Sequence, residues 1–249
     1  MRQKIFVYIP RYTNNFACNF CRILTGKLGV RMEKYINQII NADCIAILKE
    51  LPDKSIDLVL TDPPYGINCE GGGYGLGVAP KVLNKKNWDS KIPSKIVFDE
   101  IFRISKNQII FGGNYFTEYL KATKSWIFWD KIGSYKLKNN FSEGELIWTS
   151  FKNVTKKITF VQQGFINDDK EENKFRFHPT QKPLRLFEMI LNDYSNENDL
   201  ILDCFSGSGT TAIACHNLKR RFICIEKDKD YFGASVERLK NAQAQLKLF

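Results

Sequence analysis

The chain has 249 residues, is 43% hydrophobic and carries a net charge of +10 from 37 basic and 27 acidic residues. It has no run of the ~18 to 20 apolar residues that a membrane-spanning helix needs, and no signal-peptide core near its start. Its seven cysteines are an odd number without a secretion signal, so they indicate free thiols. We therefore expect a cytoplasmic protein, and the basic charge favours a polyanionic partner such as nucleic acid.

Residues 1–31 hold six basic residues, no acidic one and no clear periodicity. Cys18 and Cys21 form a lone CxxC pair, which falls short of the four ligands of a structural zinc site, so no metal is expected. We predict that 1–31 is an extension, either a disordered or artefactual leader or an arm that touches DNA. The folded domain is expected to span 32–249.

From residue 32 onward, strand-like and helix-like patterns alternate along the chain. The predicted strands are 36–42, 56–60, 108–111, 126–129, 145–149, 200–205 and 221–225. The predicted helices are 44–51, 95–104, 115–121, 184–191, 210–218 and 230–246. Buried apolar strands that alternate with helices predict an α/β fold, Rossmann-like, with a mostly parallel seven-stranded sheet covered by helices on both faces.

A glycine-rich turn follows the strand at 200–205, with the sequence Phe205-Ser-Gly-Ser-Gly209 and then a helix. Glycines let the backbone approach a ligand closely, and Glu226, about twenty residues further on, is placed to bond a ribose diol. The turn lacks the full GxGxxG of a dinucleotide site and the GK[ST] of a P-loop. It therefore indicates another nucleotide-like ligand, or else a tight turn that only connects strand to helix.

The second motif is Asp62-Pro63-Pro64-Tyr65, directly after the strand at 56–60. Two prolines restrict the backbone, so the Asp62 carboxylate and the Pro63 carbonyl become rigid acceptors beside the Tyr65 ring. Two acceptors and an aromatic face suit a planar amine. Taken alone, the tetrapeptide could also be a plain proline turn.

Together, the two motifs resemble those of the methyltransferases that act on adenine N6 or cytosine N4 of DNA, in which D/N/S-P-P-Y/F/W is catalytic and F-x-G-x-G binds the cofactor. The segment His178-Pro-Thr-Gln-Lys-Pro183 resembles a further cofactor-binding segment of this family. The resemblance covers residues from about 34 to 245 and is weakest in the middle. Because the tetrapeptide precedes the glycine turn, the order resembles the circularly permuted beta subgroup.

The resemblance implies S-adenosyl-L-methionine as the cofactor and a methyltransferase version of the expected fold. It implies catalytic roles in holding the target base for Asp62, Pro63, Pro64 and Tyr65. Asp43 would face the cofactor adenine and Glu226 its ribose, while Thr180 and Lys182 would approach the methionine carboxylate. The other expected cofactor-binding residues are Asp203, Phe205, Gly207, Gly209 and Thr210.

An inserted segment at about 130–177 lies where the family keeps its target-recognition region, and it mixes basic with aromatic residues. Lysines can meet phosphates and glutamines can read base edges, so the segment favours target recognition over the alternative of a solvated charged loop. The expected DNA-binding residues are Lys152, Lys156, Lys157, Gln162, Gln163, Lys174 and Arg176. The glycine-rich loop 66–77 either orders over the site or stays disordered.

The sequence therefore predicts methylation of adenine N6 in double-stranded DNA by direct transfer to a flipped-out base. The alternatives are cytosine N4, RNA, a protein glutamine, or a DNA-binding regulator that has lost catalysis. A cognate restriction endonuclease and a homodimer are possible partners.

Overall fold

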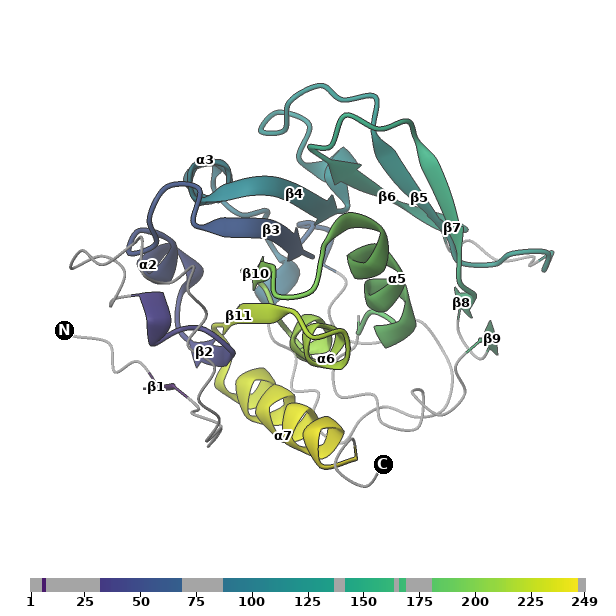
Figure 1. The fold of residues 1–249 in the computed structure, drawn as a ribbon. Coiled ribbons are helices and arrows are strands. Elements are labelled where there is room, and N and C mark those ends of the chain that lie inside the picture. The colour runs from purple at the N-terminus through teal and green to yellow at the C-terminus, as the bar shows by residue number, and fades with distance from the viewer. Residues whose placement is uncertain are drawn as a thin grey trace.

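A computed structural model describes residues 6–7, 32–68, 87–136, 142–163, 166–168 and 181–245. Within these ranges, nine strands form one mixed sheet (Figure 1). In order across the sheet they are β1 (Phe6–Val7), β2 (Gln38–Asn41), β11 (Arg221–Glu226), β10 (Leu200–Asp203), β3 (Ile56–Thr61), β4 (Ser105–Phe111), β6 (Gly144–Thr149), β5 (Trp126–Asp130) and β7 (Lys156–Thr159).

The five strands β2, β11, β10, β3 and β4 run parallel to one another at the centre of the sheet. The chain reaches β3 long before β10, yet β10 pairs directly with β3 and aligns Ile201 with Leu58. This interleaving brings the carboxyl ends of two strands that are far apart in the sequence to the same edge. Open α/β sheets bind their ligands at that edge.

Helices cover both faces of the sheet (Figure 1). They are α2 (Cys44–Leu48), α3 (Lys95–Ile104), α5 (Leu184–Tyr194), α6 (Thr210–Asn217) and α7 (Lys229–Gln245). Alternate residues of the strands point to opposite faces, so Leu58 and Ile201 pack with α5, α6 and α7, while Val59 and Leu202 pack with α2 and α3. The near-continuous apolar strands are thus explained by burial on both sides.

The fold prediction is confirmed as an α/β, mostly parallel arrangement, but its seven strands are too few for the described residues. β1 comes from the predicted extension and pairs antiparallel with β2, where Phe6 faces Asn41. β7 adds a parallel edge strand beyond β5. A separate two-stranded pair, β8 (Gln162–Gln163) and β9 (Ile166–Asn167), was also not predicted.

The helix predicted at 115–121 is wrong. The chain instead forms a short 3-10 turn, η3 (Gly113–Tyr115), which ends at Phe116 with φ −122°. The backbone N–H groups of Tyr119 and Leu120 then both donate to the carbonyl of Phe116. Burial of the Phe116 ring against Phe98 and Trp148 outweighs the helical spacing of this short segment.

In the described part of the chain, no helix is long and apolar enough to cross a lipid bilayer. The same residues contain no cluster of three or more His, Cys, Asp and Glu side chains that could hold a metal ion. Cys18 and Cys21 lie outside the described residues.

Adjacent residues of β6 test the assignment of the sheet faces. Ile147 is fully buried in the core, whereas Leu146 is 41% exposed. We expect Ile147→Ala to lower the free energy of unfolding by about 2–5 kcal/mol, because it leaves a cavity. The matched control Leu146→Ala should change it by less than about 1 kcal/mol. Urea denaturation measures both, and equal losses would contradict the assignment.

Candidate active site

Four neighbouring parallel strands each lead into an acidic residue at the same edge of the sheet. β2 is followed by Asp43, β11 ends at Glu226, β10 ends at Asp203 and β3 is followed by Asp62. The two motifs singled out in the sequence therefore lie side by side, because β10 pairs with β3. The edge is acidic, which suits a ligand with positive charge.

The carboxylate of Asp203 joins the two motifs. Its Oδ1 accepts hydrogen bonds from the Thr61 hydroxyl (2.8 Å) and from the backbone N–H of Phe205 (3.1 Å), while Oδ2 accepts one from the Thr211 hydroxyl. Burial raises the pKa of Asp203 to about 6, although these hydrogen bonds act to lower it. Asp203 is only 4% exposed, so we infer that it orders the cofactor loop rather than offering a free carboxylate to a ligand.

The glycine turn needs its glycines, since Gly207 and Gly209 have φ values of +49° and +76°. Glu226 supports the turn by accepting the backbone N–H of Gly207 at 2.7 Å, and its other oxygen accepts the N–H of Asp228 at 2.7 Å. Burial raises the pKa of the Glu226 carboxyl to about 7.

Helix α7 holds the far side of the turn. Arg238 donates to the carbonyl of Ser208 at 3.1 Å and to the hydroxyl of Thr210 at 2.9 Å. A side chain at Gly209 would meet Ser235 of α7 at 2.9 Å, so the close packing of α7 also requires glycine there. The Thr210 hydroxyl therefore serves the architecture of the loop.

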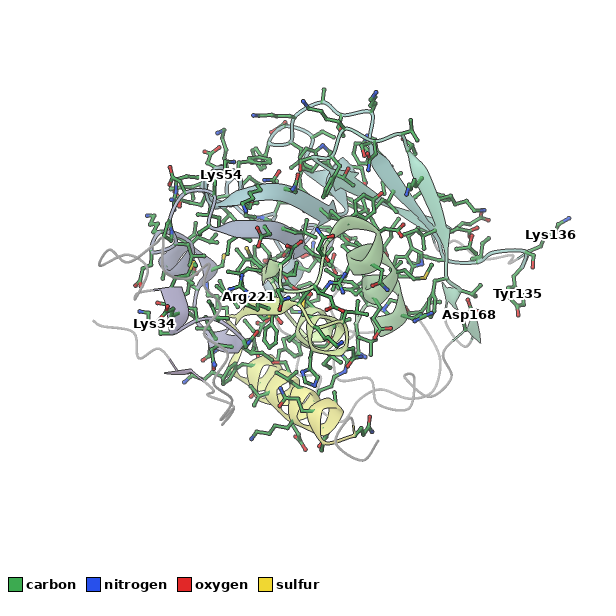
Figure 2. The ribbon with its side chains drawn as sticks, in the orientation of Figure 1. Lys34, Lys54, Tyr135, Lys136, Asp168 and Arg221 are labelled. Atoms are coloured by element: carbon green, nitrogen blue, oxygen red, sulfur yellow. The ribbon has the colours of Figure 1, made fainter. Side chains whose placement is uncertain are left out.

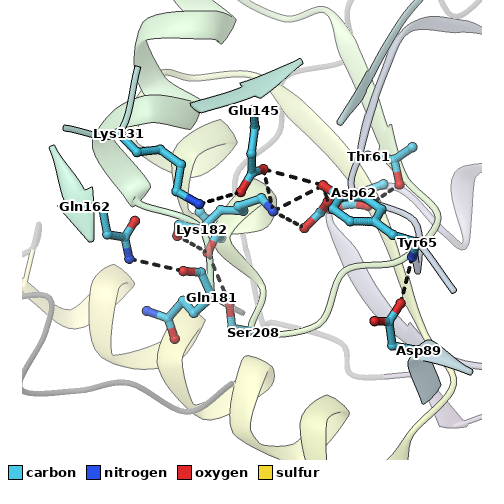
Figure 3. Close-up of polar contacts among 12 residues, drawn as sticks. Thr61, Asp62, Tyr65, Asp89, Lys131, Glu145, Gln162, Gln181, Lys182 and Ser208 are labelled. Carbon is cyan, nitrogen blue, oxygen red and sulfur yellow. Dashed lines mark hydrogen bonds and ion pairs between the residues drawn. The ribbon is translucent and has the colours of Figure 1, made fainter. Parts of the chain in front are cut away.

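Asp62 is satisfied on both oxygens (Figure 3). Its Oδ1 accepts a hydrogen bond of 2.6 Å from the hydroxyl of Tyr65, and its Oδ2 lies 2.9 Å from Lys182 Nζ. Burial raises the pKa of the Asp62 carboxyl above its ordinary value, even though the charge of Lys182 acts to lower it. Oδ1 carries this one hydrogen bond and, as a carboxylate oxygen, can accept a second from an incoming amine.

Lys182 bridges two carboxylates, since its Nζ also lies 3.1 Å from Oε2 of Glu145, whose Oε1 lies 3.0 Å from Lys131. Burial acts to lower the pKa of Lys182, but Asp62 and Glu145 outweigh it and raise the pKa above its ordinary value. For Glu145, burial acts to raise the pKa, yet the two lysines leave it below its ordinary value. We call Asp62, Lys182, Glu145 and Lys131 the charge cluster.

The Tyr65 ring is held on several sides. It stacks on Tyr115 with ring centroids 4.8 Å apart and an interplanar angle of 11°. Gly112 lies so close to it that an added Cβ would overlap the ring, and the φ of +62° at Gly112 also favours glycine. The Asp89 carboxylate accepts the backbone N–H groups of Tyr65 (2.7 Å) and Gly66 (3.0 Å). The ring is thus positioned before any substrate binds.

Two expected cofactor-binding residues have other partners in this structure. The Lys182 ammonium is bonded to Asp62 and Glu145, and its expected role at the methionine carboxylate stays a prediction. Asp43 caps α2 by accepting the N–H of Ile45 at 3.1 Å, and it pairs with Lys227 at 2.9 Å. Thr180 lies outside the described residues.

Two of the expected DNA-binding residues, Lys156 and Lys157, are neighbours on β7. They approach Asp193 at 3.7 Å and Asp130 at 2.8 Å respectively, on opposite sides of the strand, so these two side chains do not share one surface. Gln162 donates to the carbonyl of Gln181 at 3.4 Å and its Oε1 is buried, so its amide is turned inward in this structure. That Gln162 reads a base edge stays a prediction.

Lys152 is exposed, as a phosphate-binding residue would be. Lys174 and Arg176 lie outside the described residues, and only the backbone of Gln163 is described. In the described part of the chain that follows β5, Tyr135 and Lys136 point outward (Figure 2).

Sequence reasoning missed the residues that surround the tetrapeptide. They are Thr61, Asp89, Gly112, Tyr115, Lys131, Glu145 and Arg238. For Glu145 there was one local signal in the sequence, since it is a charged residue at the start of the predicted strand 145–149, which is otherwise apolar over 146–148. The others carry no local pattern, because only the tertiary fold brings them to the site.

The sequence profile of the DNA methylase family matches residues 147–237. The type II methyltransferase M.HpaI of Haemophilus parainfluenzae is 29% identical over 238 residues, covering 81% of this chain and 74% of that protein. M2.MboI of Moraxella bovis is 26% identical over 249 residues, covering 84% and 89%.

Solved structures are similar to this chain as well. M1.HpyAVI in complex with S-adenosylmethionine is 25% identical with a TM-score of 0.53, covering 81% of this chain and 98% of that one. The cytosine-N4-specific PvuII DNA methyltransferase, at 16% identity, shares the fold with a TM-score of 0.52, covering 83% and 91%. Residues 147–237 thus match the DNA methylase family, and over most of its length the chain is similar to type II DNA methyltransferases and to a methyltransferase that binds S-adenosylmethionine.

Proposed function

We propose that this chain methylates N6 of adenine in double-stranded DNA, and that Asp62, Pro63, Pro64 and Tyr65 hold the flipped-out base. The observation that carries the proposal is the adjacency of the tetrapeptide and the glycine turn, which the Thr61–Asp203 hydrogen bond of 2.8 Å spans directly. A base amine held at Asp62 would then lie next to a cofactor held at the turn. Proximity of this kind supplies much of the rate of a transfer reaction.

The residues at the edge fit S-adenosyl-L-methionine. The cofactor carries a cationic sulfonium and no phosphate, and the strand ends supply the carboxyl groups of Asp43, Asp203 and Glu226. Glu226, at the end of β11, would bond the ribose diol. Phe205, Gly207 and Gly209 would line the methionine part, with Asp203 and Thr210 as the supports of that loop.

The cofactor supplies an electrophilic methyl group when it is bound. The amine of a nucleobase is a poor nucleophile, because its lone pair is conjugated with the ring. Asp62 and the Pro63 carbonyl would accept its two N–H groups and turn the lone pair toward the methyl carbon. The nitrogen would then take the methyl group as the carbon–sulfur bond gives its electron pair to sulfur, and one N–H proton would pass to the Asp62 carboxylate that holds it. Preorganised acceptors are the main contribution of the protein.

Adenine is the favoured base because Asp occupies the first position of the tetrapeptide, where cytosine enzymes of the resembled family often have Ser. The order of the motifs supports assignment to the beta subgroup. Cytosine N4 is the second candidate, since the relatives include a cytosine-N4-specific enzyme. A cognate endonuclease and a homodimer remain proposals that rest on the type II relatives.

The decisive experiment uses methyl-labelled cofactor and unmethylated genomic DNA, followed by digestion to nucleosides. We expect the label in N6-methyladenine. Asp62→Ala should lower turnover by at least about 100-fold, because the site then lacks a preorganised acceptor, while cofactor binding is retained. Label in N4-methylcytosine would overturn the choice of base. A variant that bound cofactor and kept wild-type turnover would overturn the role of Asp62.

The raised pKa of Glu226 predicts how the stability of the ligand-free protein depends on pH. The folded protein keeps this proton up to about pH 7, whereas the unfolded chain releases it near pH 4.5, so ionisation of Glu226 lowers stability as the pH rises through that window. Glu226→Gln removes this loss. The Tm of the variant relative to wild type should therefore rise from about pH 5 to about pH 8.

The matched control for this measurement is Glu237→Gln, which alters an exposed carboxylate of α7. Its Tm relative to wild type should not change with pH over the same range. A pH-independent difference for Glu226→Gln would contradict the prediction.

The lysines of β7 test the interaction with the DNA backbone. Lys156→Ala with Lys157→Ala should weaken binding to every DNA sequence and make the slope of log affinity against log salt shallower by about 0.9 for each phosphate that the protein no longer neutralises. Because the two ammonium groups lie on opposite sides of β7, one single variant should reproduce most of the effect. An unchanged salt slope in the double variant would exclude β7 from the interface.

A further inference from the structure

We propose that Glu145 is a positioning residue for the methyl transfer, which anchors the ammonium of Lys182 so that Lys182 bonds Oδ2 of Asp62 and leaves Oδ1 for the base amine. The inference rests on the proposed function of Asp62. Glu145 contacts Lys182 at 3.1 Å, and its Oε2 also lies 3.5 Å from the Tyr65 hydroxyl that bonds Oδ1 of Asp62 (Figure 3).

The geometry of Lys182 carries the first step. A lysine ammonium has three donors on a flexible four-carbon stem, so one carboxylate partner does not define its direction. Here Nζ is held between Oδ2 of Asp62 at 2.9 Å and Oε2 of Glu145 at 3.1 Å, and the side chain is only 9% exposed. The carboxylate of Glu145 therefore keeps the Lys182 ammonium at Oδ2 of Asp62 and prevents it from bonding both oxygens of Asp62.

The charge balance carries the second step. The charge cluster contains two carboxylates and two lysines in contact, with Lys131 3.0 Å from the far oxygen of Glu145. Without Glu145, the positive charge of Lys182 would fall on Asp62 alone, and Asp62 would become a weaker hydrogen-bond acceptor. Burial has the largest effect on the pKa of Asp62 and raises it, Lys182 lowers it, and Glu145 raises it. Glu145 therefore offsets part of the effect that Lys182 has on Asp62.

The position of Glu145 in the chain links the tetrapeptide to a second part of the sheet. Glu145 lies near the start of β6 and Lys131 follows the end of β5, so both flank the connection between these two strands. This connection falls in the predicted target-recognition segment.

The test compares Glu145→Gln with Lys131→Gln at saturating DNA and cofactor. We expect Glu145→Gln to lower kcat by roughly 10- to 100-fold, as misplacement of a catalytic group does, without a change in the Kd of the cofactor. The acid limb of the pH profile should move to lower pH in Glu145→Gln, because Asp62 then lacks a negative neighbour. In Lys131→Gln it should move to higher pH, because the charge cluster then loses a positive charge that favours ionised carboxylates.

Other groups near the charge cluster titrate as well. The measured quantity is therefore the difference between each variant and wild type in the pH of the acid limb, rather than the pH of the limb in any one protein. Tyr65 contacts Asp62 directly, and Asp203 and Glu226, with pKa values of about 6 and about 7, lie at the same edge of the sheet. They are unchanged in every variant. Glu143→Gln, an exposed carboxylate two residues away, is the matched control and should leave kcat and the pH profile as in wild type.

Opposite shifts of the limb in the two variants would support the positioning role, because a merely structural contact does not predict them. An unchanged kcat in Glu145→Gln would overturn it. So would shifts of the same sign in both variants, or a loss of cofactor affinity and Tm that accounts for the fall in kcat. If Asp62→Ala kept its turnover, the proposed function would fail first, and the two failures are thereby distinguished.

Discussion

The carboxylate of Asp203 is the group on which the site depends. It receives hydrogen bonds from Thr61 on β3, from the backbone of the glycine turn and from Thr211 on α6, so three elements meet at one buried group. A buried carboxyl is tolerated only when its oxygens are bonded, and here the protein uses that requirement to fix the distance between the two motifs. Without these hydrogen bonds, β3 and β10 would still pair, but the buried carboxylate of Asp203 would no longer connect the end of β3 to the glycine turn and to α6.

A second buried network, the charge cluster, ties the tetrapeptide to the other half of the sheet. Asp62 follows a central parallel strand, whereas Glu145 and Lys131 belong to the antiparallel pair β6 and β5. Burying charges opposes stability unless each charge is paired, and here each carboxylate contacts at least one lysine. Apolar side chains of similar size would stabilise the fold as well, so we infer that the charge cluster is present for function rather than for stability.

The side chains of the tetrapeptide already have partners within the protein. The Tyr65 hydroxyl occupies Oδ1 of Asp62, and Tyr115 stacks on the Tyr65 ring, so the acceptor is already bonded and the ring already packed. An N–H donor of a base would add to, or replace, the hydrogen bond from the Tyr65 hydroxyl at Oδ1. In both cases the buried carboxylate keeps a hydrogen-bond partner and its orientation.

The sequence by itself determined the fold class, most helices and strands of the central sheet, and the two motifs at strand ends. These features depend on local patterns, namely runs of apolar residues, glycines that permit positive φ, and prolines that stiffen the backbone. The tertiary structure alone decided the partners of Lys182, the inward turn of Gln162 and the opposite directions of Lys156 and Lys157. It also replaced the predicted helix at 115–121 with a turn that brings Tyr115 to Tyr65. The reason is physical: a periodic pattern records which side of an element is buried, but the partner of a charged side chain depends on strands that are adjacent in space and distant in the sequence.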